Sequence, residues 1–214
     1  VHRLLSSMQR EGLVEQGADR RYHLGAELWL LGMAAGARFD LVQIGLDALE
    51  RLEAATHDTI YLLRRVGDDV FCVARRDGRY PIKSLVMEVG RSYPLGVGGG
   101  GLAVLAALPA NEQKEILARV KGRIGEYPKI TFARIRTLLA DTMKHGHAFW
   151  PALISEAYVV AVPILGADGR PVGALSCAAI KERLDPKRRR KVAMLLKAEA
   201  DALGRRLSGT RMSK

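Results

Sequence analysis

The order of apolar segments after residue 57 constrains the fold more than any other feature of the sequence. Helical patterns separate two groups of strand-like segments, and turns rich in Gly and Asp join neighbouring strands within a group. The strands are expected at 59–65, 70–76 and 82–89, and then at 158–165 and 172–180. This order predicts an α+β fold in which helices flank an antiparallel sheet, and it argues against regular βαβ alternation.

Helical periodicity predicts most of the remaining elements. The expected helices cover 1–12, 26–38, 41–56, 102–108, 109–123, 132–145 and 186–207. A small hairpin of 13–16 and 22–24 separates the first two, and no capping residue precedes the first, so we expect the sequence to begin inside an element. The helix at 26–38 is apolar on nearly every face, and so short an N-terminal piece cannot cover it. We therefore expect a partner subunit to bury this helix.

The composition is that of a folded protein without a membrane segment. Of the 214 residues, 48% are hydrophobic and 27% are charged, which excludes a disordered chain or a coiled-coil rod. The longest apolar runs, such as 28–35, are much shorter than the roughly 18 residues of a membrane span. No secretory signal begins the sequence, and two cysteines cannot make a disulfide framework. We therefore expect a cytoplasmic protein with no membrane partner.

Positive charge is concentrated near the C-terminal end. The net charge is +11, and residues 181–214 alone carry 12 basic and 4 acidic side chains. The run Arg188-Arg189-Arg190-Lys191 lies within a helical pattern and has no aromatic residues among it. It fits either a phosphate-binding patch or an ordinary solvated helix face, and the pattern leaves both interpretations open.

A glycine-rich segment opens one of the central helices. Gly96, Gly98 and Gly101 match G-x-G-x-x-G, but the segment lacks a βαβ unit, and Lys121 stands where a dinucleotide site needs an acid. Four successive glycines at a helix start leave backbone N–H groups uncovered, which favours binding of a carboxylate or phosphate. Close packing of backbone against backbone is the alternative explanation.

Residue patterns for catalysis or metal binding are poor. No Ser lies in G-x-S-x-G, and His145 and His147 lack a nearby third metal donor, so we expect no enzyme activity, no cofactor and no metal site. Cys72 and Cys177 lie in apolar strands and are expected to be buried. The apolar stretch 149–154 either lines a pocket or covers the sheet.

The N-terminal pattern and three spaced motifs in the rest of the chain match one known protein family. Residues 1–5, 12–15 and 21–25 are similar to the end of a winged helix-turn-helix. Pro94-Leu95 with Gly101 and Ala103 falls on a P-L-x-x-x-x-x-G-K-A segment. Ala161-Val162-Pro163-Ile164 falls on A-A-P-V, and Ala174-Leu175-Ser176 with Arg183-Leu184 falls on A-L-S…R-L. Together these matches resemble the IclR family of bacterial transcription regulators.

The resemblance implies the organisation of the chain. Residues 1–25 would be the remnant of a winged helix-turn-helix whose first two helices are absent, 26–39 a linker helix, and 40–214 a GAF-like effector-binding domain. The resemblance also implies a double-stranded DNA operator, a small-molecule effector and homodimers, with dimers of dimers in part of the family. A sensor module that acts through protein contacts, without specific DNA binding, is the alternative.

The resemblance places two sets of site residues. In the head, the first helix would be the recognition helix and the hairpin a wing that reaches phosphates. The implied DNA-binding residues are His2, Arg3, Ser6, Ser7, Arg10, Arg20 and Arg21. The implied effector-binding residues are Val97, Gly98, Gly99, Gly100, Gly101, Phe149, Trp150, Val159, Ser176 and Ala178.

Departures from the family pattern suggest the kind of effector. The last strand reads Ser176-Cys177-Ala178 where relatives that bind small oxo-acids have Ser-x-Ser, and the family's Gly-Lys is Gly101-Leu102. Phe149-Trp150-Pro151 stands in place of an acidic loop. Because each change removes a polar group, we expect a carboxylate effector that is partly apolar or aromatic, with its carboxylate on the N–H groups of 98–101.

Overall fold

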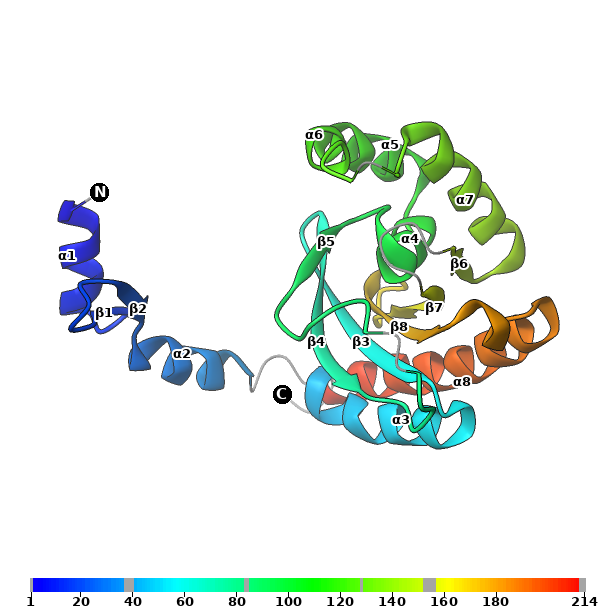
Figure 1. Cartoon of the computed structure of the whole chain (residues 1–214), viewed down its shortest axis with the longest axis horizontal. Coiled ribbons are helices and arrows are strands. Elements are labelled where there is room, and N and C mark those ends of the chain that lie inside the picture. Colours follow the sequence, from blue (N-terminus) through cyan, green and yellow to red (C-terminus); the bar gives the residue numbers. More distant parts are fainter. Residues whose placement is uncertain (1, 37–40, 83–84, 128, 152–156, 212–214) are drawn as a thin grey trace. The chain divides into compact units, whose positions relative to one another are not determined.

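The computed structural model describes residues 2–36, 41–82, 85–127, 129–151 and 157–211. The chain divides into two compact units, a small one at 1–40 and a large one at 41–214. Figure 1 shows their elements with the labels used below. Each unit is described by itself.

The small unit contains two helices and one hairpin, as the sequence predicts. Its elements are α1 (His2–Arg10), β1 (Val14–Gln16), β2 (Tyr22–Leu24) and α2 (Ala26–Gly36). The two strands are antiparallel, with Val14 opposite Leu24. Gly12 follows α1 with a φ of +67°, and its N–H donates to the Gln9 carbonyl. This left-handed glycine ends α1 and directs the chain into the hairpin.

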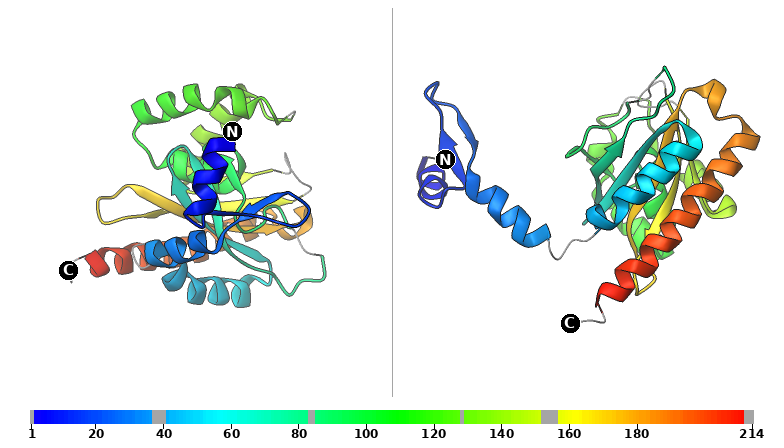
Figure 2. Two further views of the ribbon diagram at one scale, coloured as in Figure 1. Left: turned by 90° about the vertical axis from the view of Figure 1, so that its left-hand side faces the viewer. Right: turned by 90° about the horizontal axis from the view of Figure 1, so that it is seen from below.

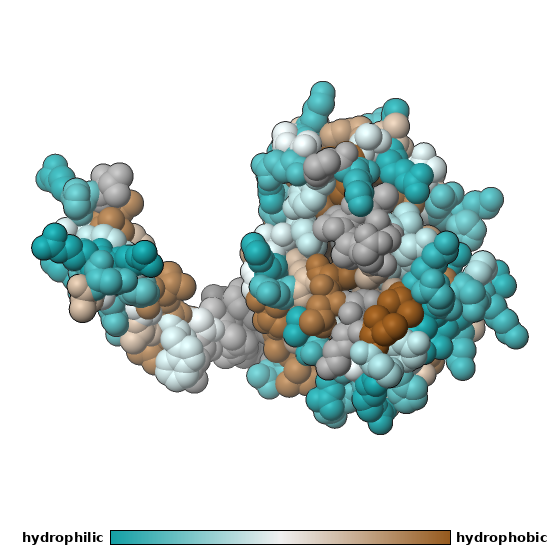
Figure 3. Space-filling view, viewed as in Figure 1, coloured by the Kyte–Doolittle hydropathy of each residue, from teal (hydrophilic) through white to brown (hydrophobic). Residues whose placement is uncertain are grey.

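The helix α2 presents apolar side chains to its surface. Trp29, Leu30 and Leu31 are 67%, 49% and 56% exposed. Apolar side chains are also visible on this part of the chain in the space-filling view (Figure 3). Within the small unit nothing described covers them, and burial of this helix by a partner subunit stays a prediction.

The large unit is built on one six-stranded antiparallel sheet. The strand order is β5-β4-β3-β8-β7-β6, so β3 and β8, from opposite ends of the unit's sequence, are central neighbours. The strands are β3 (Thr59–Val66), β4 (Asp69–Arg76), β5 (Ser92–Pro94), β6 (Ala148–Trp150), β7 (Tyr158–Leu165) and β8 (Pro171–Ala179). The predicted α+β class with an antiparallel sheet is confirmed.

Helices cover both faces of this sheet. On one face lie α3 (Leu41–Thr56) and α8 (Pro186–Arg211), side by side (Figure 2). The other face carries α4 (Gly98–Ala106), α5 (Ala110–Arg119), α6 (Lys121–Ile124) and α7 (Phe132–His145), and the short η1 (Lys181–Arg183) precedes α8. The side chains of β3 alternate between two cores: Ile60 and Leu62 pack under α3 and α8, and Tyr61 and Leu63 pack under α4.

The structure corrects three of the predicted elements and adds one. The described part of 82–89 contains no strand, and the third strand is the later β5; residues 83 and 84 lie outside the described residues. The three-residue strand β6 was not predicted, because its length is too short for a clear period. The central helix begins at Gly98 rather than Leu102, and the helix expected at 109–123 is two helices that meet at Val120.

Candidate functional site

A cavity lies between the start of α4, the sheet and the segment that precedes β5. Its volume is about 40 Å³, which is room for roughly three water molecules. The lining is mostly apolar and comprises Tyr61, Leu63, Val70, Val86, Met87, Tyr93, Val97, Gly98, Gly99, Gly100, Gly101, Trp150, Val159 and Ser176. It contains no Asp or Glu among the described residues.

The start of α4 supplies uncapped backbone donors to this cavity. Val97 is the N-cap in extended conformation, and none of its side-chain atoms caps the helix. Gly98 then adopts a φ of +71°, which favours glycine. The first N–H groups of an α-helix have no partner within the helix, and they lie at the positive end of its dipole. An anionic atom in the cavity would find donors here.

Close packing also explains the glycines. A Cβ at Gly99 would lie 2.7 Å from Val159 Cγ1, and one at Gly100 would lie 1.9 Å from Leu63 Cδ1. The first turn of α4 therefore rests directly on the sheet, and both positions need glycine whether or not a ligand binds. The packing interpretation holds for these two residues, and it is compatible with anion binding by the same turn.

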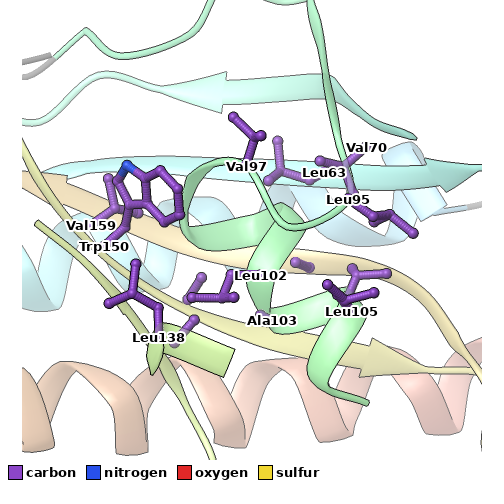
Figure 4. Close-up of a cluster of buried hydrophobic side chains, with 14 of the residues drawn as sticks. Leu63, Val70, Leu95, Val97, Leu102, Ala103, Leu105, Leu138, Trp150 and Val159 are labelled. Carbon is purple, nitrogen blue, oxygen red and sulfur yellow. The ribbon is translucent and has the colours of Figure 1, made fainter. Parts of the chain in front are cut away.

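Trp150 carries a buried donor without a partner. The residue is 2% exposed, and its indole Nε1 has no hydrogen-bond partner among the described residues. Figure 4 shows the indole beside Val159 and near Val97. An unsatisfied buried N–H costs about 1–3 kcal/mol. A ligand with an acceptor atom in this cavity would remove that cost.

Two tyrosine hydroxyls hold the segment over the cavity. The Val86 N–H donates to Tyr61 Oη at 3.0 Å, and the Tyr93 hydroxyl donates to the Val86 carbonyl at 3.3 Å. Burial raises the pKa of Tyr61 to about 12, so its hydroxyl stays neutral at physiological pH. Because the cavity is small, a ligand larger than a few waters requires movement of this segment or of the side chains beneath it.

The sheet places most of the predicted effector residues together. The five residues 97–101, with Trp150, Val159 and Ser176, line the cavity. Ala178 is buried in the core on the same face of the sheet but does not line the cavity. Phe149 lies on the opposite face, where its ring packs against Tyr158 with centroids 5.3 Å apart. Neighbouring residues of a strand point to opposite faces, so Phe149 and Trp150 cannot both reach one site.

Sequence reasoning missed several lining residues. Tyr61, Leu63 and Val70 come from β3 and β4, Val86 and Met87 come from the segment that precedes β5, and Tyr93 comes from β5 itself. The alternation of β3 could have identified Tyr61 and Leu63 as a pair on one face. Of the apolar stretch 149–154, residues 152–154 lie outside the described residues.

The predicted DNA-binding residues are all on the surface of the small unit. His2, Arg3, Ser6, Ser7 and Arg10 are exposed on α1. Ser7 Oγ donates to the Arg3 carbonyl at 3.0 Å, and Arg10 Nη2 donates to Ser7 Oγ at 3.5 Å, so these three share one side of the helix.

The two predicted wing residues lie at the end of the hairpin. Arg20 has a φ of 61° in the turn, and the Arg21 guanidinium lies 3.7 Å from the Asp19 carboxylate. Both arginines are exposed. These two arginines give the hairpin a short basic tip. Exposed arginine side chains of this kind are the groups that contact DNA phosphates.

One arginine of the basic run near the C-terminal end stabilises the fold. Asp58 is buried, and its carboxylate accepts hydrogen bonds from Arg183 Nε at 2.6 Å and Arg188 Nη2 at 2.8 Å. Arg188 therefore joins the start of α8 to β3. Lys187 and Lys191 are exposed and remain compatible with a solvated face.

Reactive and metal-binding groups are sparse in the part of the chain that the structure describes. No group of three or more His, Cys, Asp or Glu residues there could hold a metal ion, and none of the helices is long and apolar enough to cross a membrane. Cys72 and Cys177 are buried as expected. Burial raises the pKa of Cys72 to about 11 and also raises that of Cys177, so both thiols are protonated at neutral pH.

Sequence comparisons identify relatives for most of the chain. The family described as "Bacterial transcriptional regulator IclR C-terminal" matches residues 33–205. The HTH-type transcriptional regulator KipR of Bacillus subtilis is 23% identical over 189 residues, which are 86% of this chain and 74% of KipR. The HTH-type transcriptional regulator KdgR of Dickeya chrysanthemi is 31% identical over 122 residues, which are 56% of this chain and 40% of KdgR.

Solved structures agree with this assignment. An IclR transcriptional regulator of Silicibacter sp. TM1040 is 27% identical, with a TM-score of 0.83 and coverage of 97% of this chain and 82% of its own. The IclR of Thermotoga maritima is 25% identical, with a TM-score of 0.74 and coverage of 96% and 84%.

A third structure shows the same fold at 24% identity. It is an IclR homolog of Microbacterium hydrocarbonoxydans complexed with 4-hydroxybenzoate, with a TM-score of 0.76 and coverage of 99% of this chain and 85% of its own. The relatives named above are transcriptional regulators, a class of proteins that are not enzymes. The chain belongs to the IclR family of bacterial transcriptional regulators, and its large unit is the GAF-like effector-binding domain of that family.

Proposed function

We propose that this chain is a DNA-binding regulator whose large unit responds to a small carboxylate with an apolar or aromatic body. The observation that carries the proposal is the buried Trp150 Nε1–H, which lacks a partner among the described residues in an otherwise apolar cavity. Buried N–H groups almost always have a hydrogen-bond acceptor, and a bound ligand would supply one here.

The donors in the cavity favour an anion. The uncapped first turn of α4 and the indole of Trp150 supply N–H groups, and Ser176 supplies a hydroxyl. Since the described lining contains no carboxylate, nothing in it repels a negatively charged ligand. A carboxylate placed at the start of α4 would accept these hydrogen bonds at the positive end of the helix dipole.

The walls favour an apolar body. Leu63, Val70, Met87, Val97 and Val159 form most of the lining, so a hydrophilic acid would bury its polar groups against hydrocarbon. An aromatic ring would gain from the same burial. The complex of the Microbacterium relative with 4-hydroxybenzoate supports this ligand class for the fold.

Effector binding would act by a shift between conformations. A cavity of about 40 Å³ does not accommodate a benzoate-sized ligand, so binding would select a state in which the segment around Val86 has moved. In a homodimer joined through the apolar surface of α2, such a shift would change how two heads meet DNA. The exposed side of α1 with Arg3, Ser7 and Arg10 would contact the operator.

Calorimetric titration with two sets of acids tests the ligand class. We expect benzoate and 4-hydroxybenzoate to bind, and acetate and lactate to bind much more weakly. Trp150→Phe keeps an aromatic ring but removes the donor, so it should weaken binding about tenfold, the equivalent of one hydrogen bond. Tyr22→Phe, in the small unit, also removes one polar group from an aromatic side chain; it is the control and should leave affinity unchanged. Binding of the short acids alone, with no effect of Trp150→Phe, would refute the proposal.

A further inference from the structure

A second cavity lies at the edge of the sheet that β6 forms. It is an open groove of about 690 Å³ between the C-terminal half of α7, strand β6 and the N-terminal half of α8. Its lining comprises Leu138, Asp141, Thr142, His145, Gly146, His147, Phe149, Pro186, Arg189, Arg190, Ala193, Met194 and Lys197. None of these residues lines the cavity at the start of α4, although β6 contributes one residue to each, Phe149 here and Trp150 there.

One arginine of the groove is half-buried and has no anionic partner in the described part of the chain. The Arg189 guanidinium lies over the ring of Phe149, 3.9 Å from the ring centroid, and its buried Nε has no hydrogen-bond partner among the described residues. The Nε of the preceding Arg188 is also buried without a described partner, but its Nη2 donates to the Asp58 carboxylate at 2.8 Å and to the Thr56 carbonyl at 2.7 Å. A desolvated guanidinium ordinarily has a carboxylate or phosphate partner.

The other charged groups leave the groove positive. Arg190 is exposed next to Arg189, and no ion pair of either arginine occurs within the described ranges. Lys197 is neutralised by Asp201, with its Nζ 3.1 Å from the carboxylate. Asp141 is the one acid among the described lining residues, and it lies exposed on α7.

Two histidines at the end of α7 add donors to the same space. The His145 Nδ1–H donates to the Asp141 carbonyl at 2.8 Å, and the His147 Nδ1–H donates to the His145 carbonyl at 3.1 Å. A carbonyl can only accept, so each imidazole uses Nδ1 as the donor. Burial lowers the pKa of His147, the hydrogen bond to the His145 carbonyl raises it, and the nearby positive charge of Arg189 lowers it further.

We propose that this groove is a second ligand site, which binds a small organic carboxylate with an apolar body. Arg189 and Arg190 would hold the carboxylate as a planar fork, and Leu138, Ala193 and Met194 would contact the body. The two arginines lie at the N-terminal end of α8 in the groove, and the apolar residues continue along the same side of the helix and on α7. The site does not depend on the ligand proposed for the other cavity.

Proton NMR of the histidine rings during titration with benzoate tests this proposal. No histidine is present in the described lining of the α4 cavity, so the C2–H signals of His145 and His147 report on the groove. We expect a saturable shift of the His147 signal. We also expect its apparent pKa to rise on binding, because a neighbouring carboxylate stabilises the imidazolium.

Variants separate the groove from other sites. Arg190→Gln changes an exposed side chain and should weaken the His147 response at least about tenfold. Arg189→Gln should do the same. Lys191→Gln removes the same charge from a neighbouring exposed position outside the groove and should retain the response. Trp150→Phe should also retain it, which separates this proposal from the one for the α4 cavity. A linear, non-saturating shift, or an unchanged response in Arg190→Gln, would overturn the proposal.

Discussion

Ser176 and Trp150 illustrate how single substitutions set the chemistry of the α4 cavity. On β8 the residues Ser176 and Ala178 belong to the core beneath α4, whereas Cys177 belongs to the opposite core. The alternation of the strand therefore leaves one hydroxyl where a Ser-x-Ser strand would present two on the same face. On β6 the indole of Trp150 provides an N–H donor instead of a carboxylate. The first difference makes the site more apolar, and the second makes it better suited to an anion.

Gly99 gives a prediction about stability at the residue scale. Gly99→Ala would place a Cβ 2.7 Å from Val159 Cγ1, and the β-branched Val159 has little freedom to move. We expect the free energy of unfolding to fall by about 1–3 kcal/mol. Gly122→Ala, in α6, has no atom within 4 Å of its new Cβ and should be neutral or stabilising by up to about 1 kcal/mol. Urea denaturation of both variants measures the difference, and equal effects would show that the contact at Gly99 can relax.

At the scale of elements, the longer helices and strands could be predicted because their apolar periods are clear. The sequence predicts the hairpin in the small unit, strands β3, β4, β7 and β8, and helices α3, α7 and α8 to within a few residues. Strand β6 could not be predicted, because it contains three residues and depends on pairing with Val159–Ala161 of β7. In the apolar run 85–87, Val86 and Met87 cover the cavity, and that run resembles a strand.

The candidate cavity could also be predicted in part from the sequence. Its glycine turn is a local sequence feature, and the resemblance supplied Trp150, Val159 and Ser176. Tyr61 and Tyr93 reach the cavity only through long-range strand pairing, which a single sequence does not specify. Phe149 was assigned to the cavity with Trp150 because the boundaries of β6, and hence its alternation, were unknown.

An ion-pair cluster joins α5 to the sheet and gives a pH-dependent prediction. Glu112 of α5 accepts a hydrogen bond from Arg65 of β3 at 2.8 Å and also pairs with Arg170, next to β8. These two arginines hold the pKa of Glu112 below its ordinary value of 4.5. Stability from a carboxylate with a lowered pKa is complete above that ordinary value and is lost as the pH falls through the lowered one.

Glu112→Gln should therefore destabilise the protein at pH 7 and much less at pH 3. The expected change is within about 1 kcal/mol, because the cluster is partly exposed to solvent. Glu115→Gln on the same helix is the control, since its carboxylate is 3.9 Å from Arg119 and 69% exposed. Chemical denaturation at the two pH values measures the effect. An equal loss at both values would mean that the charge of Glu112 does not stabilise the fold.

At the scale of the whole molecule, the exposed apolar surface of α2 indicates that the chain self-associates. Its exposed Trp29, Leu30 and Leu31 form a surface that water solvates poorly, and a second copy of the chain would bury it. Leu31→Lys should shift the protein toward monomers in analytical ultracentrifugation. Leu165→Lys, at a residue on β7 that is 40% exposed, should not. Association that is unaffected by Leu31→Lys would place the subunit contact elsewhere.

The most direct test of the central claim joins the two proposed functions in one titration. The protein is titrated into labelled DNA from upstream of its own coding region, with and without 4-hydroxybenzoate, and fluorescence anisotropy is followed at several salt concentrations. We predict sequence-selective binding with a salt dependence of several phosphates, and an affinity that the carboxylate changes in the natural protein but much less in Trp150→Phe. Weak binding that is equal for all sequences and indifferent to the carboxylate would contradict the account and would indicate a sensor that acts through protein contacts.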